Sequence, residues 1–233
     1  MIGEWVMRSF LSTSSGVILF LSWVCTVSAG YLTGVEPPSG IAPLRVISEP
    51  TLHSIIENGV RPLVTAREQE LYLQELDGSP PNWDHLHDEE GEEMGGRLFV
   101  FNRERDEVRE GHALLTQRIA FLWSGFLRTY QPQHNGFSVA MGPELTPTEW
   151  GIVRFKPIGL PDEMVAVPSP DILPSLQAKL SAGETVEVGI LFTGRLVPYE
   201  SIMYGISHDG SEQGMVLPFV QIEGVEYFLQ PDD

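Results

Sequence analysis

The alternation of apolar residues near the C-terminal end constrains the fold more than any other feature of the sequence. Every second residue of 186–192 is apolar, which is the period of a strand with one buried face. The strands predicted in this way cover 186–197, 201–207, 215–222 and 225–229. Asp209-Gly210 and Glu223-Gly224 separate them as turn signals. Several short strands in succession, separated by turns, predict a small antiparallel barrel or sandwich.

An earlier stretch echoes this one. Leu, aromatic, hydroxyl, Gly, any residue, Leu, any two residues and Tyr occur in this order at 122–130 and again at 191–199, and Gly-apolar-Val occurs at 151–153 and 214–216. Two interpretations stay open. One is a duplicated β module, over 118–168 and 187–231; the other is two β-rich segments that share residues because strands use few residue types. The repeated Gly125 and Gly194 predict a bulge or bend in each segment.

Residues 1–29 predict a signal peptide. Arg8 supplies a basic region, residues 16–24 are apolar, and Val27 and Ala29 are the small residues that a signal peptidase needs. The apolar run is about a dozen residues, shorter than the roughly 20 of a membrane span. We therefore predict a periplasmic or secreted protein with no transmembrane span in the mature chain. Lipidation at Cys25 is an alternative that the bulky residues before it disfavour.

Cleavage after Ala29 would remove the only cysteine of the 233-residue chain. The mature protein would then have no disulfide and no thiolate ligand, and packing alone would stabilise it. The net charge of −18 repels nucleic acid and anionic lipid. It favours cations or a basic partner surface, although an acidic surface also simply keeps an exported protein soluble.

The rest of the chain divides by composition. The predicted parts are an extended Pro- and Gly-rich linker at 30–50, a helical segment and acidic loop at 51–96, a first β module at 97–168, a connecting helix at 169–184 and a second β module at 185–233. Thr65 and Glu68 form a capping box that begins a helix, which Asp77-Gly78 ends. The predicted fold class is α+β and β-dominated, a small antiparallel barrel or sandwich of two β modules with a few short N-terminal helices.

The polar stretch 83–93 contains the candidate metal ligands, Asp84, His85, His87 and Asp88. In an extended backbone His85 and His87 would point the same way, and the carboxylates would add oxygen ligands for a divalent cation. The spacing matches no specific metal motif, so a solvated acidic loop is the competing interpretation.

A charged helix is predicted after a strand at 97–101, with Asn102 as its N-cap. Arg103 and Glu107 would pair at i,i+4. Arg105 and Arg109 add a basic stripe, which either binds a carboxylate or phosphate or belongs to a solvent-exposed, salt-bridged helix.

The sequence contains no nucleophile elbow, zinc-protease, P-loop or dinucleotide motif. Our first hypothesis is therefore an exported, non-catalytic β-rich binding or envelope-assembly module. Its partner would be another protein of the cell envelope, bound through Tyr130 and Tyr199 or through strand edges. The alternatives are a hydrolase that uses carboxylates or a metal near the acidic His-rich loop, and a structural protein ordered by Ca²⁺.

Overall fold

The structure is a computed structural model that describes residues 38–47, 51–87, 92–142, 144–207 and 214–230, without the side chains of 87 and 92–94. The chain divides into two compact units, Met1–Val35 and Glu36–Asp233. Only the second contains described residues. The signal-peptide prediction lies outside them.

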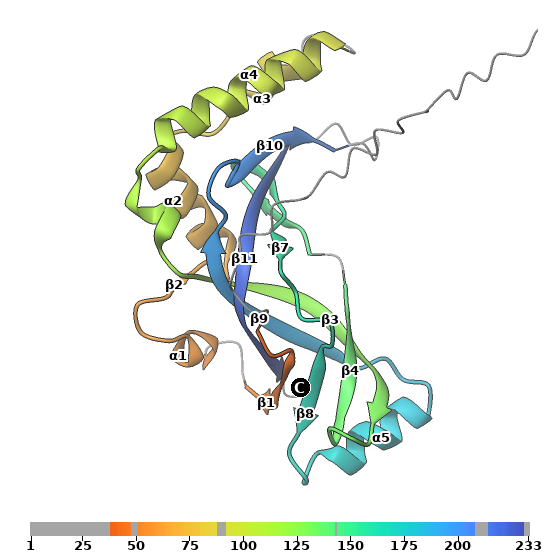
Figure 1. Cartoon of the computed structure of the whole chain (residues 1–233). Helices are drawn as coiled ribbons and strands as arrows, with labels where there is room; N and C mark the ends of the chain where they lie inside the picture. The colour runs from red at the N-terminus through yellow and green to blue at the C-terminus, as the bar shows by residue number, and fades with distance from the viewer. Residues whose placement is uncertain (1–37, 48–50, 88–91, 143, 208–213, 231–233) are drawn as a thin grey trace, which may run out of the picture. The chain divides into compact units, whose positions relative to one another are not determined.

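Six strands form a closed barrel in the order β1, β8, β4, β3, β9, β11 and back to β1 (Figure 1). Their bounds are β1 Ile41–Val46, β3 Ile119–Gln131, β4 Gly136–Met141, β8 Val165–Pro168, β9 Glu187–Leu196 and β11 Gly214–Leu229. The predicted β-dominated barrel is thus confirmed. Its predicted antiparallel character holds for four neighbouring pairs only, because β1 runs parallel to both β8 and β11.

Strand β1 lies inside the stretch predicted as a linker, so that prediction is wrong for residues 41–46. The sequence did not predict this strand, because Pro43 argues against a strand that is paired on both sides. In the structure Pro43 does not need to pair on both sides. Residues 41–44 pair with β8, whereas only residues 44–46 pair with β11, so Pro43 lies where β1 has one neighbour.

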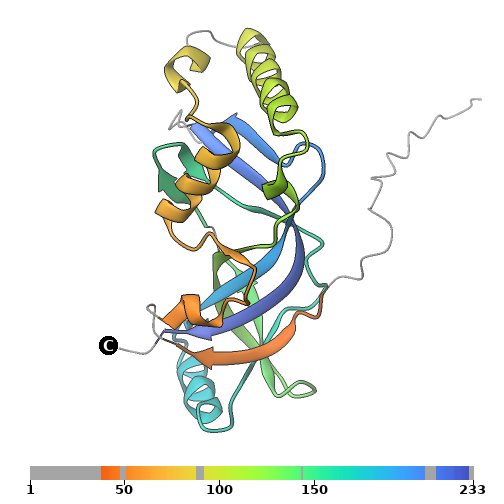
Figure 2. The ribbon, with the colours of Figure 1, turned by 90° about the vertical axis from the view of Figure 1, so that its left-hand side faces the viewer.

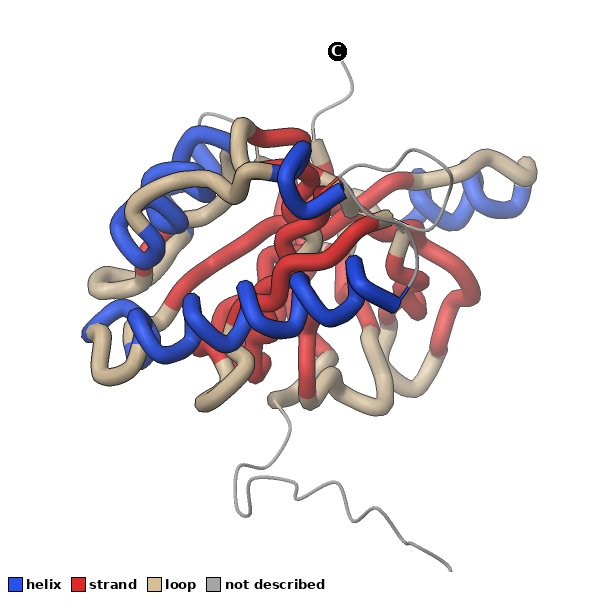
Figure 3. The backbone as a smooth tube through the Cα atoms, turned by 90° about the horizontal axis from the view of Figure 1, so that it is seen from above, coloured by secondary structure: helices blue, strands red, loops and turns tan. Residues whose placement is uncertain are grey.

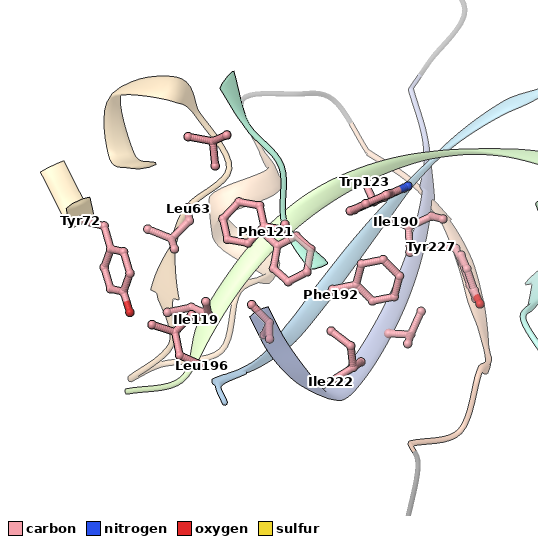
Figure 4. Packing of buried hydrophobic residues seen from close by; sticks show 14 of the residues in the cluster. Leu63, Tyr72, Ile119, Phe121, Trp123, Ile190, Phe192, Leu196, Ile222 and Tyr227 are labelled. Atoms are coloured by element: carbon pink, nitrogen blue, oxygen red, sulfur yellow. The ribbon is translucent and has the colours of Figure 1, made fainter. Parts of the chain in front are cut away.

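The barrel core follows the alternation seen in the sequence. On β3 and β9 the side chains of Ile119, Phe121, Ile190 and Phe192 are fully buried. Phe121 stacks on Phe155, with ring centroids 4.2 Å apart. Figure 4 shows the four side chains of β3 and β9 converging between the strands.

Strand β11 is continuous, although two strands were predicted over the same residues. The pairing with β9 shifts between Ile222 and Gly224, which is a β-bulge. The buried positions are even-numbered up to Ile222 and odd-numbered from Val225 to Tyr227. The bulge therefore keeps apolar side chains facing the core on both sides of the Glu223-Gly224 break.

Further strands extend the sheet beyond the barrel: β2 Arg61–Pro62, β5 Thr146–Thr148, β6 Gly151–Val153, β7 Lys156–Ile158 and β10 Ile202–Ile206. β6, β7 and β10 all pair with β11, the first two in parallel and the third antiparallel.

The helices lie around the strands rather than between them (Figure 3). They are α1 Leu52–Ile55, α2 Ala66–Asp77, α3 Trp83–His87, α4 Glu92–Arg109 and α5 Leu173–Ser181, with a 3-10 turn at Ala113–Thr116. α5 lies at the opposite end of the strands from α4 in both side views (Figure 2). The capping box of Thr65 and Glu68 is confirmed, and Gly78 ends α2 with a φ of 76°.

Helix α4 begins earlier than predicted and includes residues 97–101, so the predicted strand is wrong. Tertiary contacts outweigh strand propensity here. Phe101 packs edge-on against Tyr204, with ring centroids 5.2 Å apart. Asn102 lies inside the helix instead of capping it, and its side chain contacts the backbone of β10.

The echoing segments of the sequence lie next to each other. Leu122 of β3 is the direct antiparallel partner of Leu191 of β9, and residues 152–153 pair in parallel with residues 215–216. The duplication itself stays a prediction. The prediction of a bulge or bend at the repeated glycines has two outcomes. Gly125 lies within regular pairing with both neighbouring strands, so no bulge occurs there. Gly194 pairs regularly with β3 but lies at the register shift between β9 and β11, opposite the bulge of β11. A Cβ on Gly194 would lie 2.1 Å from the carbonyl oxygen of Gln221.

Candidate functional site

The predicted metal ligands lie on α3 as far as the structure describes them. Asp84, His85 and His87 belong to this helix, and Asp88 lies outside the described residues. The extended geometry assumed for the two histidines is wrong. Residues 83–87 are helical rather than extended, so the reason for expecting the two histidines on one side of the chain no longer holds.

Within the described part of the chain no three His, Cys, Asp or Glu residues gather closely enough to hold a metal ion. The cation site at the four residues therefore remains a prediction.

The basic stripe of α4 is divided between surface and interior. Arg103 pairs with Glu107 on the surface as predicted, at 3.3 Å. Arg109, however, is 1% exposed and contacts the fully buried carboxylate of Asp77. Its Nε and Nη2 donate to the two carboxylate oxygens at 2.6 and 2.5 Å. Arg109 thus binds a carboxylate, as one interpretation had it, but that carboxylate is internal.

Every guanidinium contact of Arg109 is structural. Its Nη1 donates to Asp106 at 3.0 Å and to the carbonyl of Ile202 at 2.8 Å, and the Tyr204 hydroxyl donates to Asp77. Burial raises the pKa of Tyr204, and the Asp77 charge raises it further. Because these groups satisfy one another, we assign the cluster to holding α2, α4 and β10 together.

The predicted tyrosine pair does not form one surface. Tyr199 is 91% exposed, whereas Tyr130 packs against Phe137 at 5.3 Å between ring centroids. The two tyrosines follow Leu122 and Leu191 by the same number of residues on antiparallel strands, so they lie at opposite ends of the β3–β9 pair.

A cleft of about 650 Å³ on the flank of the barrel is the best candidate for a binding site. Its floor is the outer face of β3, β9 and the end of β11, where Leu122, Gly189 and Phe228 lie. A Cβ on Gly189 would lie 2.0 Å from the Phe228 ring. Glycine at this position therefore lets the aromatic ring lie flat across β9.

Two walls border this floor, one around α5 and one around α1. Figure 1 shows both helices beside this end of the barrel. Helix α5 supplies Ser175, Leu176 and Lys179, and its N-cap residue Ile172 lies beside them. The opposite wall consists of Val46, Ile47, Leu52, His53, Val64 and Thr65.

The polar groups of the cleft are largely engaged by the protein. The amide of Ser124 donates to Glu144 Oε2 at 3.1 Å, and the indole of Trp123 donates to the carbonyl of Gly142 at 2.6 Å. His53 Nε2 lies 2.8 Å from Glu68 Oε1. Glu184 and Glu187 are exposed at the edge. Such a site offers an apolar surface with fixed polar groups and a carboxylate rim, which suits binding.

Sequence reasoning missed this cleft because its lining comes from several separate segments. No motif marks residues that only the fold brings together. The signal available was Gly189 between the apolar residues Val188 and Ile190, since a glycine inside a strand indicates a close approach.

No protein-family model matches the chain, and neither a curated protein nor a solved structure shows significant similarity to it. In the described residues, no helix has both the length and the apolar character needed to cross a bilayer.

Proposed function

We propose that the protein is an exported, non-catalytic binding protein that holds an amphipathic ligand in the cleft between α5 and the barrel. The lining of the cleft carries the proposal. About half of its residues are apolar. Those of the floor lie on strands of a closed barrel, so this part of the site is formed before the ligand arrives.

The charges of the cleft favour a ligand with a positive group. Glu144, Glu184 and Glu187 lie in the lining, against Lys179 as its one lysine or arginine. A cationic head group would meet these carboxylates while the apolar body covers Leu122 and Phe228. An anionic head group would be repelled.

Export rests on the sequence of residues 1–29, and a role in envelope assembly is consistent with it. A basic and apolar segment of an envelope protein has the positive charge and the apolar surface that the cleft favours. Binding such a segment would also be a role in envelope assembly. The same cleft would also accept a small cationic amphiphile.

Two probes of equal apolar length separate the contribution of the head-group charge from that of the apolar chain. Octyltrimethylammonium and nonanoate, both below their micelle concentrations, are titrated into the protein in a calorimeter. We expect saturable binding of the cation and at least tenfold weaker binding of the anion. Equal or absent binding of both would contradict the proposed ligand class.

A pair of matched variants locates the site. Ser175→Trp places an indole in the cleft from an exposed position of α5, and Ser181→Trp makes the same change at an exposed position outside the lining. Only Ser175→Trp should weaken binding of octyltrimethylammonium. Equal effects of the two variants would place the binding elsewhere.

A further inference from the structure

A second surface lies on the outer face of the first half of β11, away from the cleft. Ile152 and Val153 pair with Met215 and Val216, and Lys156 pairs with Phe219. The register is the same on both sides of Arg154, whose amide donates to the carbonyl of Val216 at 2.9 Å. Arg154 therefore runs alongside Leu217.

Alternation places the two cations on one face. Val153 and Phe155 are buried in the core, 2% and 5% exposed. Successive strand residues point to opposite faces, so Arg154 and Lys156 point outwards together with Leu217 and Phe219 of β11.

These two cations are unpaired. Among the described residues neither Arg154 nor Lys156 has an ion pair or a side-chain hydrogen bond. Elsewhere in the β region Arg45, Arg118 and Arg195 each reach a carboxylate. Burial lowers the pKa of Lys156, and the charge of Arg154 lowers it further.

Two neighbouring cations without a carboxylate partner are unusual in a chain of net charge −18. Like charges side by side cost energy, and this chain has more than twice as many acids as bases from which to supply a partner. An external anionic group that bridges Arg154 and Lys156 would remove the repulsion and gain charge-assisted hydrogen bonds.

The cations lie among apolar side chains that the core does not use. Met203, Met215, Leu217 and Phe219 are partly exposed and pack against neither hydrophobic cluster of the described residues. Met203 pairs with Leu217 across β10 and β11. Methionine adapts its shape to a bound surface, so this face combines an adaptable apolar area with two positive charges.

We propose that this face, formed by Arg154, Lys156, Met203, Met215, Leu217 and Phe219, binds an acidic and apolar segment of a partner protein. The carboxylates of the segment lie between Arg154 and Lys156, and its apolar side chains cover the methionines and Phe219. A short segment senses mainly the charges within about 10 Å at moderate salt. A long polyanion or an anionic membrane meets the negative charge of the whole protein and is repelled.

The probe is a fluorescently labelled ten-residue peptide of alternating Glu and Leu, followed by anisotropy with the full protein. We expect saturable binding that salt weakens and that Arg154→Gln/Lys156→Gln weakens at least tenfold. Arg67→Gln/Arg103→Gln is the matched control, since it removes two exposed cations of α2 and α4. It should leave the affinity unchanged.

A second measurement excludes misfolding as the cause. Because Arg154 and Lys156 repel each other, Arg154→Gln/Lys156→Gln should melt no lower than the parent protein. Equal binding of the peptide to the two double variants, or no binding by the parent protein at millimolar concentration, overturns the proposal. So does binding to phosphatidylglycerol vesicles that depends on Arg154 and Lys156 while peptide binding does not, because the surface would then recognise a membrane.

Discussion

Asp77 and Arg109 face each other in the interior, with the Arg109 Nε–H and Nη2–H donating to the two carboxylate oxygens. The carboxylate comes from the last residue of α2 and the guanidinium from the last residue of α4. Both side chains are removed from solvent, and this two-fold contact is closer than the pairs that Asp106 and Arg105 add at 3.0 and 4.0 Å. Through the contacts of Arg109 with Ile202 and of Asp77 with Tyr204, this ion pair also joins α2 and α4 to β10.

Removing one member of this pair should be costly. Arg109→Met leaves the buried Asp77 with only the distant Arg105 as a counter-charge, 4.0 Å from Oδ2, and we expect the free energy of unfolding in urea to fall by about 3–5 kcal/mol. Arg103→Met on the same helix removes an exposed ion pair and should cost under about 1 kcal/mol. Asp77→Asn/Arg109→Met should cost less than the two single changes together. Similar losses at Arg103 and Arg109 would contradict the structural role of the pair.

Asn102 takes the place of a neighbouring strand along β10. Its Nδ2 donates to the carbonyl of Tyr204 at 2.8 Å, and its Oδ1 accepts from the Tyr204 amide at 2.6 Å. Asn102→Ala should therefore accelerate hydrogen exchange of the Tyr204 amide and cost about 2–4 kcal/mol, from two unsatisfied backbone groups. Glu104→Ala, at an exposed position of the same helix, is the control. Unchanged exchange at Tyr204 in Asn102→Ala would show that another group protects this amide.

Two glycines in the sheet should respond differently to alanine. At Gly194 a Cβ would lie 2.1 Å from a backbone oxygen of β11, whereas at Gly205 the nearest atom is 4.0 Å away. Gly194→Ala must push β9 and β11 apart and should lower the free energy of unfolding by about 1–3 kcal/mol or more. Gly205→Ala should leave it unchanged or raise it by up to about 1 kcal/mol. Urea titration measures both, and a tolerated Gly194→Ala would refute the close approach.

The capping box of α2 should make stability depend on pH. Burial raises the pKa of Glu68, but hydrogen bonds from His53 and Thr65 outweigh it and hold the pKa below its ordinary value of 4.5. The unfolded chain therefore takes up the proton first, and the stabilisation is lost as the pH falls through the lowered pKa. Urea titrations of the parent protein and Glu68→Gln should differ most at neutral pH and converge in acid. A difference that does not depend on pH would mean that the charge of Glu68 is irrelevant. Thr65→Ala should cost about 1 kcal/mol at neutral pH.

The cation prediction at Asp84, His85, His87 and Asp88 is tested by melting. A cation at about 100 times its dissociation constant would add roughly 2.7 kcal/mol and several degrees. Because residues 83–87 are helical rather than extended, we expect Zn²⁺ to shift the melting temperatures of the parent protein and of His85→Ala/His87→Ala equally. A shift confined to the parent protein would restore the site, and Ca²⁺ and a chelator complete the series.

Local sequence signals predicted the local structure well. The alternation at 186–192 corresponds to β9, Thr65 and Glu68 cap α2, and Gly78 ends it with a positive φ of 76°. Each of these features is decided by residues close together in the chain.

The features that the sequence did not reveal depend on distant residues. Strand β1 pairs with β8 and β11, which lie far along the chain, and no local pattern records a parallel neighbour. Arg109 looks like a surface residue of a charged helix until Asp77 and the carbonyl of Ile202 are placed beside it. The cleft is assembled from several separate segments, none of which carries a motif.

The indole Nε1–H of Trp123 offers the most direct test of binding in the cleft. Trp123 lines the cleft and its indole donates to the carbonyl of Gly142, whereas Trp83, whose indole donates to the carbonyl of Trp150, lies outside the lining. In ¹H–¹⁵N spectra recorded during a titration with octyltrimethylammonium, the Trp123 indole signal should move and saturate while that of Trp83 stays in place. A stationary Trp123 signal, or equal movement of both, would contradict the proposal that the cleft is the binding site.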